Sequence, residues 1–353
     1  MNQQINLDTK NNNFNIIRFL AASLVLFSHS YPLSKSEEPL AHLSGFLTFG
    51  LLAVYIFVFI SGFLLTKSWI DTHDNVVLFI KKRILRIFPG LISVTLFTAF
   101  IIGPLVTYVP LAEYLEDPLT IMYLRNIYLY PLSSYLPGVF ENNPFPYVVN
   151  GSLWLIPVLV LLYASLAIFG LLKLINRKPY MALFTVFLFV LFFLDMSSPF
   201  LGNQSILYMP AYDLMNASLF FYVGVLCYLY RDRIVLRHSL AMLSVILLLV
   251  SLKLPHGLVI IFFTVPYLTL YFAFLDISEL RKFNRMTDLS YGIYLYSYPI
   301  QQTIMHFFRK QLNVMTFFIV SYFITLIFAY LSALLIEKPF LKFKNERVIA
   351  NHQ

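Results

Sequence analysis

The sequence predicts an all-α polytopic membrane protein with about ten transmembrane helices and with both termini in the cytoplasm. Of its 353 residues, 59% are hydrophobic and only 12% are charged, whereas a soluble domain carries about 25% charged residues. The apolar residues gather in runs close to the roughly 17 to 25 residues that a helix needs to cross a bilayer. The length alone would allow two soluble domains, but these runs favour one transmembrane domain over residues 1–353, with membrane lipid as its main solvent.

Ten segments have the length and apolarity expected of a membrane span. They are 14–32, 43–66, 87–109, 152–172, 179–195, 214–230, 238–252, 256–275, 289–306 and 313–336. Several contain proline or glycine, which membrane helices tolerate where neighbouring groups satisfy the freed backbone. The segment 110–150 is too polar to span and is expected to form a loop with an interfacial part.

The distribution of basic residues predicts the orientation of these spans. With the N-terminus inside, 19 of the 25 Lys and Arg residues fall in cytoplasmic segments and five fall in outer segments, as the positive-inside rule describes. The loop 110–150 is then extracytoplasmic or interfacial, and 337–353 is a cytoplasmic tail. The same bias accounts for the net charge of +8, so no nucleic-acid partner is expected.

Several classes of chemistry find no support in the sequence. The single cysteine, Cys227, allows neither an internal disulfide nor a thiolate metal site, and we expect no bound metal. Motifs for phosphoryl transfer, zinc proteolysis and elbow-type serine hydrolysis are missing. The polar first residues and the lack of a small-residue cleavage motif predict that no signal peptide is removed.

The first span contains two ionisable residues, Arg18 and His29, and ionisable residues within spans are functional candidates because they are costly in lipid. Eleven steps of about 100° come within about 20° of three full turns, with a rise of roughly 16 Å. One helix face therefore carries a cation near the cytoplasmic end and an imidazole towards the outside. The alternative is that Arg18 extends to lipid headgroups and that His29 is a packing residue.

Two further positions combine a functional and a structural interpretation. Arg83 and Arg86 are three residues apart and share a helix face. Their guanidinium groups can bind phosphates in pairs, and they also fit an ordinary cytoplasmic positive cluster; the two interpretations are compatible. In the second span, small residues such as Gly62 usually allow helices to pack closely, while the role of Ser61 stays open.

Six short motifs occur in order along the chain. They are Arg18 to His29, Phe57 to Leu65, Arg83 to Arg86, Asn150 to Pro157, Leu289 to Pro299 and Glu337 to Phe340. In this order and spacing the chain resembles the acyltransferase-3 family of bacterial integral-membrane O-acyltransferases over nearly its whole length. Each motif alone is weak, but six in order are specific.

The resemblance implies transfer of an acyl group, usually acetyl, from cytoplasmic acetyl-CoA to a sugar hydroxyl of a surface glycan or lipid-linked glycan. It implies an enzyme of the bacterial inner membrane in its membrane-only form, with no permanently bound cofactor. His29 and Arg18 are then the catalytic candidates, and Arg83, Arg86 and Ser61 are expected to bind the donor. Neutral histidine can accept the proton of an attacking hydroxyl or carry the acyl group itself, and the sequence does not choose between these roles.

The chain departs from the family pattern at two places. Leu159 and Val160 stand where many relatives carry a glutamate, and Ser297 stands where many carry a histidine, so the acceptor is left undefined. Two other classes of function fit the same composition. A glycan or lipid-intermediate transporter would also combine ten spans with charge inside the membrane, and a membrane scaffold would use neither Arg18 nor His29.

Overall fold

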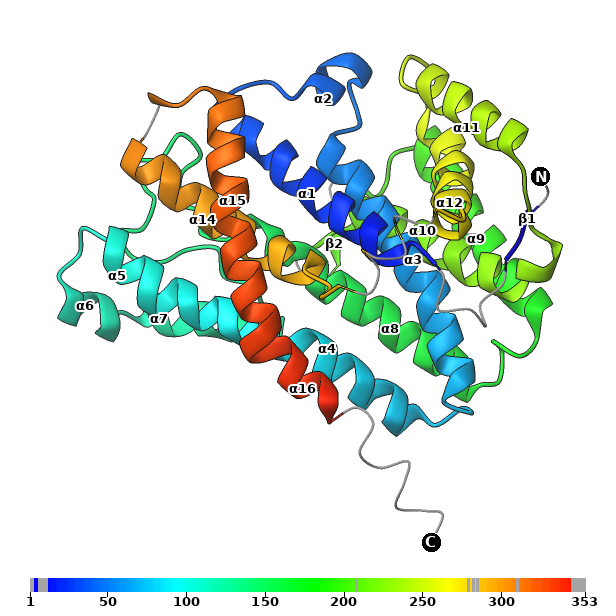
Figure 1. Cartoon of the computed structure of the whole chain (residues 1–353), viewed down its shortest axis with the longest axis horizontal. Coiled ribbons are helices and arrows are strands. Elements are labelled where there is room, and N and C mark those ends of the chain that lie inside the picture. The colour runs from blue at the N-terminus through cyan, green and yellow to red at the C-terminus, as the bar shows by residue number, and fades with distance from the viewer. Residues whose placement is uncertain are drawn as a thin grey trace, which may run out of the picture. The chain divides into compact units, whose positions relative to one another are not determined.

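The computed structural model describes residues 3–5, 12–202, 204–206, 209–277, 280, 283, 286–308 and 311–343. Some basic residues used for the predicted orientation lie outside these ranges, as does the end of the predicted tail. They are Lys10, Arg281, Lys282, Arg285, Arg309, Lys310, Lys344 and Arg347. Within the described ranges the chain is mostly helical and has almost no sheet (Figure 1), which confirms the all-α fold class.

Among the residues that the structure describes, seven helical stretches are long and apolar enough to cross a membrane. They are α1 (Phe14–Leu33), α3 (Phe49–Asp71), α4 to α5 (Val76–Val106), η3 to α8 (Gly151–Leu171), α9 (Lys178–Ser197), α10 (Ala211–Leu229) and α15 to α16 (Val314–Lys342). Two shorter apolar helices are α11 (His238–Ser251) and α12 (Leu258–Phe274), and α14 (Ser290–Phe308) is more polar. All ten expected spans thus coincide with helices, while ten crossings and cytoplasmic termini remain predictions.

The remaining elements are short. The helical ones are α2 (Pro39–Ser44), α6 (Leu111–Glu116), α7 (Pro118–Tyr123), η2 (Leu124–Tyr128) and η4 (Arg231–Arg233). The third span comprises α4 (Val76–Phe97), the π-helical η1 (Thr98–Ile102) and α5 (Gly103–Val106). The fourth span comprises η3 (Gly151–Trp154) and α8 (Leu155–Leu171). The last span comprises α15 (Val314–Ser332), the π-helical η6 (Ala333–Glu337) and α16 (Lys338–Lys342). In the described part of the chain, β1 (Gln3–Gln4) pairs with β4 (Val235–Leu236) and β2 (Ser205–Ile206) pairs with β3 (Met209–Pro210), both antiparallel.

Two predicted boundaries were wrong because capping residues, and not hydropathy, set the helix ends. The second span begins at Phe49, not at 43, since the Thr48 hydroxyl accepts a hydrogen bond from the Leu51 amide at 2.9 Å. The third begins at Val76, not at 87, behind Asn75, whose side chain accepts from the Leu78 amide at 2.9 Å. Arg83 and Arg86 therefore lie well inside α4.

The chain divides into two compact units. Unit 1 comprises residues 1–21, 40–79 and 158–286. Its centre is the packing of α3 against α10, where Gly62 faces the backbone of Phe221 and Gly224 faces the backbone of Phe59. A Cβ atom at Gly62 would lie 2.0 Å from the Phe221 carbonyl oxygen, so the packing role expected of this glycine is confirmed.

Unit 2 comprises residues 22–39, 80–157 and 287–353. In it α14 packs against α15, and Gly292 faces Ala329 at that contact. The segment 110–150, predicted as a loop with an interfacial part, contains two helices and a 3₁₀ helix. It also contributes to a buried apolar cluster that includes Tyr114, Tyr123 and Phe140, and is therefore a folded part of the unit.

Candidate active site

Arg18 and His29 lie on the same helix, as predicted, because α1 runs without interruption from Phe14 to Leu33. The Arg18 guanidinium donates a hydrogen bond to the side-chain oxygen of Asn15 at 2.5 Å, one turn earlier on α1. Three residues separate the two, the spacing at which helix side chains meet. Arg18 is thus oriented by its own helix.

Within unit 2, the His29 ring meets α14 through Tyr298. The two ring centroids are 5.1 Å apart with an interplanar angle of 80°, an edge-to-face contact typical of aromatic pairs. The neighbouring Ser28, and not the histidine, donates to the Glu38 carboxylate at 2.9 Å.

The Nδ1 atom of His29 is buried and has no hydrogen-bond partner among the described residues. A histidine oriented by a carboxylate would have its tautomer fixed by that partner. At His29 no such carboxylate binds Nδ1, so this nitrogen keeps its capacity to take a hydrogen bond or a proton from another group.

Gln301 is a site residue that the sequence reasoning missed. It is fully buried in α14, and its amide donates to the Leu26 carbonyl at 3.0 Å and to the Ser30 hydroxyl at 2.9 Å. These two acceptors bracket His29 on α1. The available signal was the pair Gln301-Gln302 inside a predicted span, because buried amides require partners.

Gln302 makes the corresponding contacts on another side of α14. Its amide nitrogen donates to the carbonyls of Phe145 and Val148, both at 2.8 Å. The Asn143 side chain donates to the Gln302 side-chain oxygen at 2.8 Å. The two adjacent glutamines thus fix α14 both to the histidine-bearing part of α1 and to the folded segment that precedes η3.

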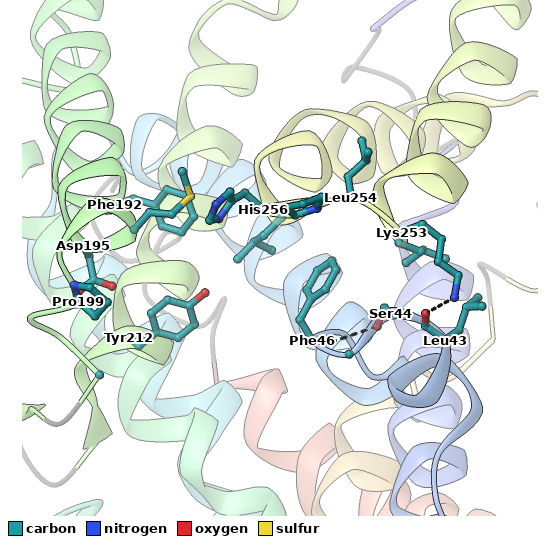
Figure 2. Close-up of a pocket in the computed structure, with 17 residues that line it drawn as sticks. Leu43, Ser44, Phe46, Phe192, Asp195, Pro199, Tyr212, Lys253, Leu254 and His256 are labelled. Atoms are coloured by element: carbon teal, nitrogen blue, oxygen red, sulfur yellow. Dashed lines mark hydrogen bonds between the residues drawn. The ribbon is translucent and has the colours of Figure 1, made fainter.

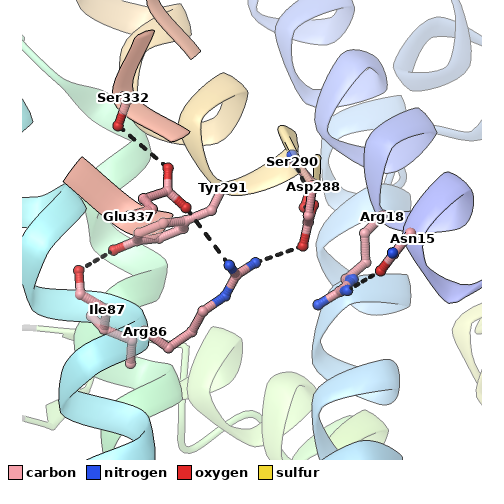
Figure 3. A network of polar contacts seen from close by, with 9 residues as sticks. All are labelled: Asn15, Arg18, Arg86, Ile87, Asp288, Ser290, Tyr291, Ser332 and Glu337. Carbon is pink, nitrogen blue, oxygen red and sulfur yellow. Dashed lines mark hydrogen bonds and ion pairs between the residues drawn. The ribbon is translucent and has the colours of Figure 1, made fainter. Parts of the chain in front are cut away.

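Arg86 lies in a cluster of charges within unit 2 (Figure 3). One guanidinium nitrogen is 2.6 Å from the Asp288 carboxylate, and another is 3.7 Å from the Glu337 carboxylate. The Tyr291 ring lies 5.8 Å from the guanidinium carbon, and its hydroxyl donates to the Ile87 carbonyl at 2.7 Å. Two carboxylates therefore already pair with the cation that the sequence assigned to donor phosphates.

The other expected donor residues are distributed over both units. Arg83 lies one turn before Arg86 on α4, in unit 2, and is half-buried. Ser61 is a half-buried residue of α3, in unit 1. Their roles stay predictions, as do those of His29 and Arg18.

The structure also places the two positions at which the chain departs from the family pattern. Leu159 is a half-buried residue of α8. Ser297 is fully buried on α14 and directly precedes Tyr298, the residue in contact with His29. Among the described residues, no group of three His, Cys, Asp or Glu side chains is arranged to hold a metal ion.

These features define a helical membrane protein whose half-buried histidine and arginines are the candidates for acyl-transfer chemistry. A model of the acyltransferase domain matches residues 11–334, and the chain belongs to this acyltransferase-3 family, which confirms the resemblance drawn from the six motifs. The chain is therefore a membrane-embedded acyltransferase.

Two curated proteins are similar to it. An O-acetyl transferase of Shigella phage Sf6 is 28% identical over 337 residues, covering 94% of this chain and 96% of the phage protein. Nodulation protein 10 of Rhizobium leguminosarum bv. viciae is 42% identical over 84 residues, covering 23% of this chain and 22% of that protein. No solved structure matches the chain.

Proposed function

We propose that this protein is an O-acetyltransferase of the bacterial inner membrane. It moves an acyl group, in the first instance acetyl, from cytoplasmic acetyl-CoA to a sugar hydroxyl of a cell-surface polysaccharide or its lipid-linked precursor. The name of the phage relative, which matches along almost the whole chain, supports the acetyl group and the oxygen acceptor. The observation that carries the proposal is His29, a half-buried histidine in an apolar helix whose buried Nδ1 atom has no hydrogen-bond partner among the described residues.

The reaction forms an ester and breaks a thioester. The acceptor oxygen bonds to the acyl carbon, the bond from that carbon to the CoA sulfur breaks, and the thiolate takes up the proton released by the hydroxyl. His29 serves this reaction as the base that holds the proton in transit, or as the nucleophile that first carries the acyl group. Both routes need a neutral imidazole whose reacting nitrogen is not already held by another side chain.

The donor is proposed to bind from the cytoplasmic side through Arg83, Arg86 and Ser61, with Arg18 on the helix that carries His29. The ion pairs of Arg86 refine its part in this proposal. Its short contact with Asp288 at 2.6 Å orients the guanidinium, whereas the contact with Glu337 at 3.7 Å is long enough to be exchanged for a phosphate oxygen. Arg86 would then accept a phosphate only in competition with a carboxylate.

The proposal is tested by mass spectrometry of surface glycans from cells with and without the gene, and from cells that express variants. His29→Ala should abolish acetylation at normal protein level, because base catalysis contributes about 10²–10⁴-fold to rate. The control is His73→Asn, at an exposed histidine with a φ of 49°, a conformation that asparagine tolerates.

The outcomes separate an enzyme from a transporter. An enzyme adds 42 Da per acetyl group to the glycan, about the mass of C₂H₂O, whereas a transporter delivers its substrate unchanged. Fully acetylated glycan from a well-expressed His29→Ala strain, with no second acyltransferase in the background, would refute the mechanism.

A further inference from the structure

Unit 1 contains a cavity of about 650 Å³ (Figure 2), within the roughly 300–1,000 Å³ range of small-molecule sites. Its walls come from the end of α2 and the turn after it, the last turns of α9 and the segment after it, the turn between α11 and α12, and the first turn of α10. None of the residues identified above as catalytic or donor-binding candidates lines it.

The connections that form the cavity lie at one end of unit 1. They occur where α9 and α11 finish and where α3, α10 and α12 begin. In the predicted orientation these are all outer ends, opposite to the basic residues Lys178 and Arg231. The cavity is therefore expected to open on the extracytoplasmic side, where a surface glycan is accessible and CoA is not.

The cavity combines aromatic surface with polar groups of both signs. The residues Phe46 and Tyr212 are 38% and 40% exposed and line the cavity, so part of each side chain is available to a ligand. Asp195, Lys253 and His256 add an anion, a cation and an imidazole to the lining. Figure 2 shows Asp195 and Tyr212 on one side of the cavity and Lys253 on the other.

Hydrogen bonds fix two parts of the wall in place. The buried Asp195 carboxylate accepts from the backbone amides of Phe200 and Leu201 at 2.9 and 2.7 Å. On the opposite side the Lys253 ammonium donates to the Leu43 carbonyl at 2.8 Å. The wall is thus held by local contacts before any ligand binds, which reduces the entropy lost on binding.

We propose that this cavity binds a sugar residue of the acceptor glycan, an inference that rests on the proposed function. A pyranose presents C–H groups on its faces and hydroxyls around its edge, so it needs flat apolar surface flanked by donors and acceptors. Phe46 and Tyr212 supply the first, and Asp195, Lys253 and His256 supply the second. A free anion is disfavoured because the lining carries the Asp195 carboxylate as well as the Lys253 cation, and an acyl chain is disfavoured because polar groups interrupt the apolar surface.

The test uses the full chain in lipid nanodiscs. The probe is the oligosaccharide released by mild acid from the surface polysaccharide of an expressing strain and then de-O-acetylated. Binding is followed by saturation-transfer NMR, and acetylation by mass spectrometry. Tyr212→Ala and Phe46→Ala should each weaken oligosaccharide binding at least tenfold, while Tyr212→Phe keeps the ring and should bind as the wild type does.

The matched control is Tyr180→Ala, which removes a tyrosine of similar exposure, 50%, from the other end of α9. Acetyl-CoA binding should be unchanged in all these variants. Equal oligosaccharide binding by Tyr212→Ala and Tyr180→Ala would overturn the proposed site while leaving the enzymatic function intact. Binding that depends on Tyr212 without any acetylation by the wild type would support the glycan site and refute the proposed function.

Discussion

At the scale of single residues, the position of His29 depends on groups that are distant in sequence. Gln301 lies more than 270 positions away from Leu26 and Ser30, yet its two hydrogen bonds bracket the histidine. The sequence identified His29 and Arg18 because charge within an apolar run is visible locally. It did not identify Gln301 or the pairing of Arg86 with Asp288 and Glu337, because those contacts arise only when distant helices pack.

Gln301→Leu should therefore impair acylation without removing a reacting group. The change removes two buried hydrogen bonds, worth about 0.5–1.5 kcal/mol each, and with them the link from α14 to α1 beside His29. The Leu26 carbonyl keeps the hydrogen bond from the Ser30 hydroxyl at 3.1 Å. We expect the purified protein to unfold at a lower temperature. We also expect its turnover number to fall while its affinity for acetyl-CoA stays unchanged. Gln311→Leu is the control, at an exposed glutamine; equal turnover in both variants would show that Gln301 does not position the histidine.

At the scale of helices, hydropathy located the spans but not their ends. The ten predicted segments all coincide with helices, since apolar runs of this length can be recognised directly in the sequence. The helix α3 starts later, and α4 starts earlier, than the predicted spans. Thr48 and Asn75 set these starts through capping hydrogen bonds that hydropathy does not record. The folded state of 110–150 was also missed, because its buried tyrosines look polar in sequence.

The α3–α10 contact predicts a strong steric effect at a single glycine. Gly62→Ala would place a methyl group 2.0 Å from the Phe221 carbonyl oxygen, and backbone cannot move aside as a flexible side chain can. We expect a loss of about 1–3 kcal/mol from overpacking, seen as reduced folded protein in detergent and a lower thermal midpoint. Gly202→Ala should be silent, because nothing lies within 4 Å of the added atom; similar behaviour of the two variants would contradict the packing.

At the scale of the whole molecule, the orientation in the membrane rests on the sequence alone. The count of 19 basic residues against five predicts it, and several of those residues lie outside the described ranges. The family match over residues 11–334 fixes the class of enzyme but not the side on which each loop lies.

Cysteine labelling tests that orientation directly. In a Cys227→Ser background, cysteines at Ser36 and Asn142 should react with an impermeant reagent in intact cells. Cysteines at His73, Lys178 and Asn351 should react only after the membrane is opened. His73 is chosen over the neighbouring Thr72 because Thr72 is buried and would be protected on either side. External labelling at Asn351 would rule out an even number of crossings with the N-terminus inside.

The close fit of Gly62 against Phe221 has a consequence for how the protein is made. The two residues are 159 positions apart, and a ribosome adding about 5–20 residues per second needs roughly 8–30 s to travel between them. During that interval α3 is already synthesised while the helix that covers its small-residue face has not yet emerged. In this state the nascent chain exposes the small-residue face of α3 to lipid and to other newly inserted proteins. The stage most prone to misassembly therefore falls midway through translation and ends only when α10 has been inserted.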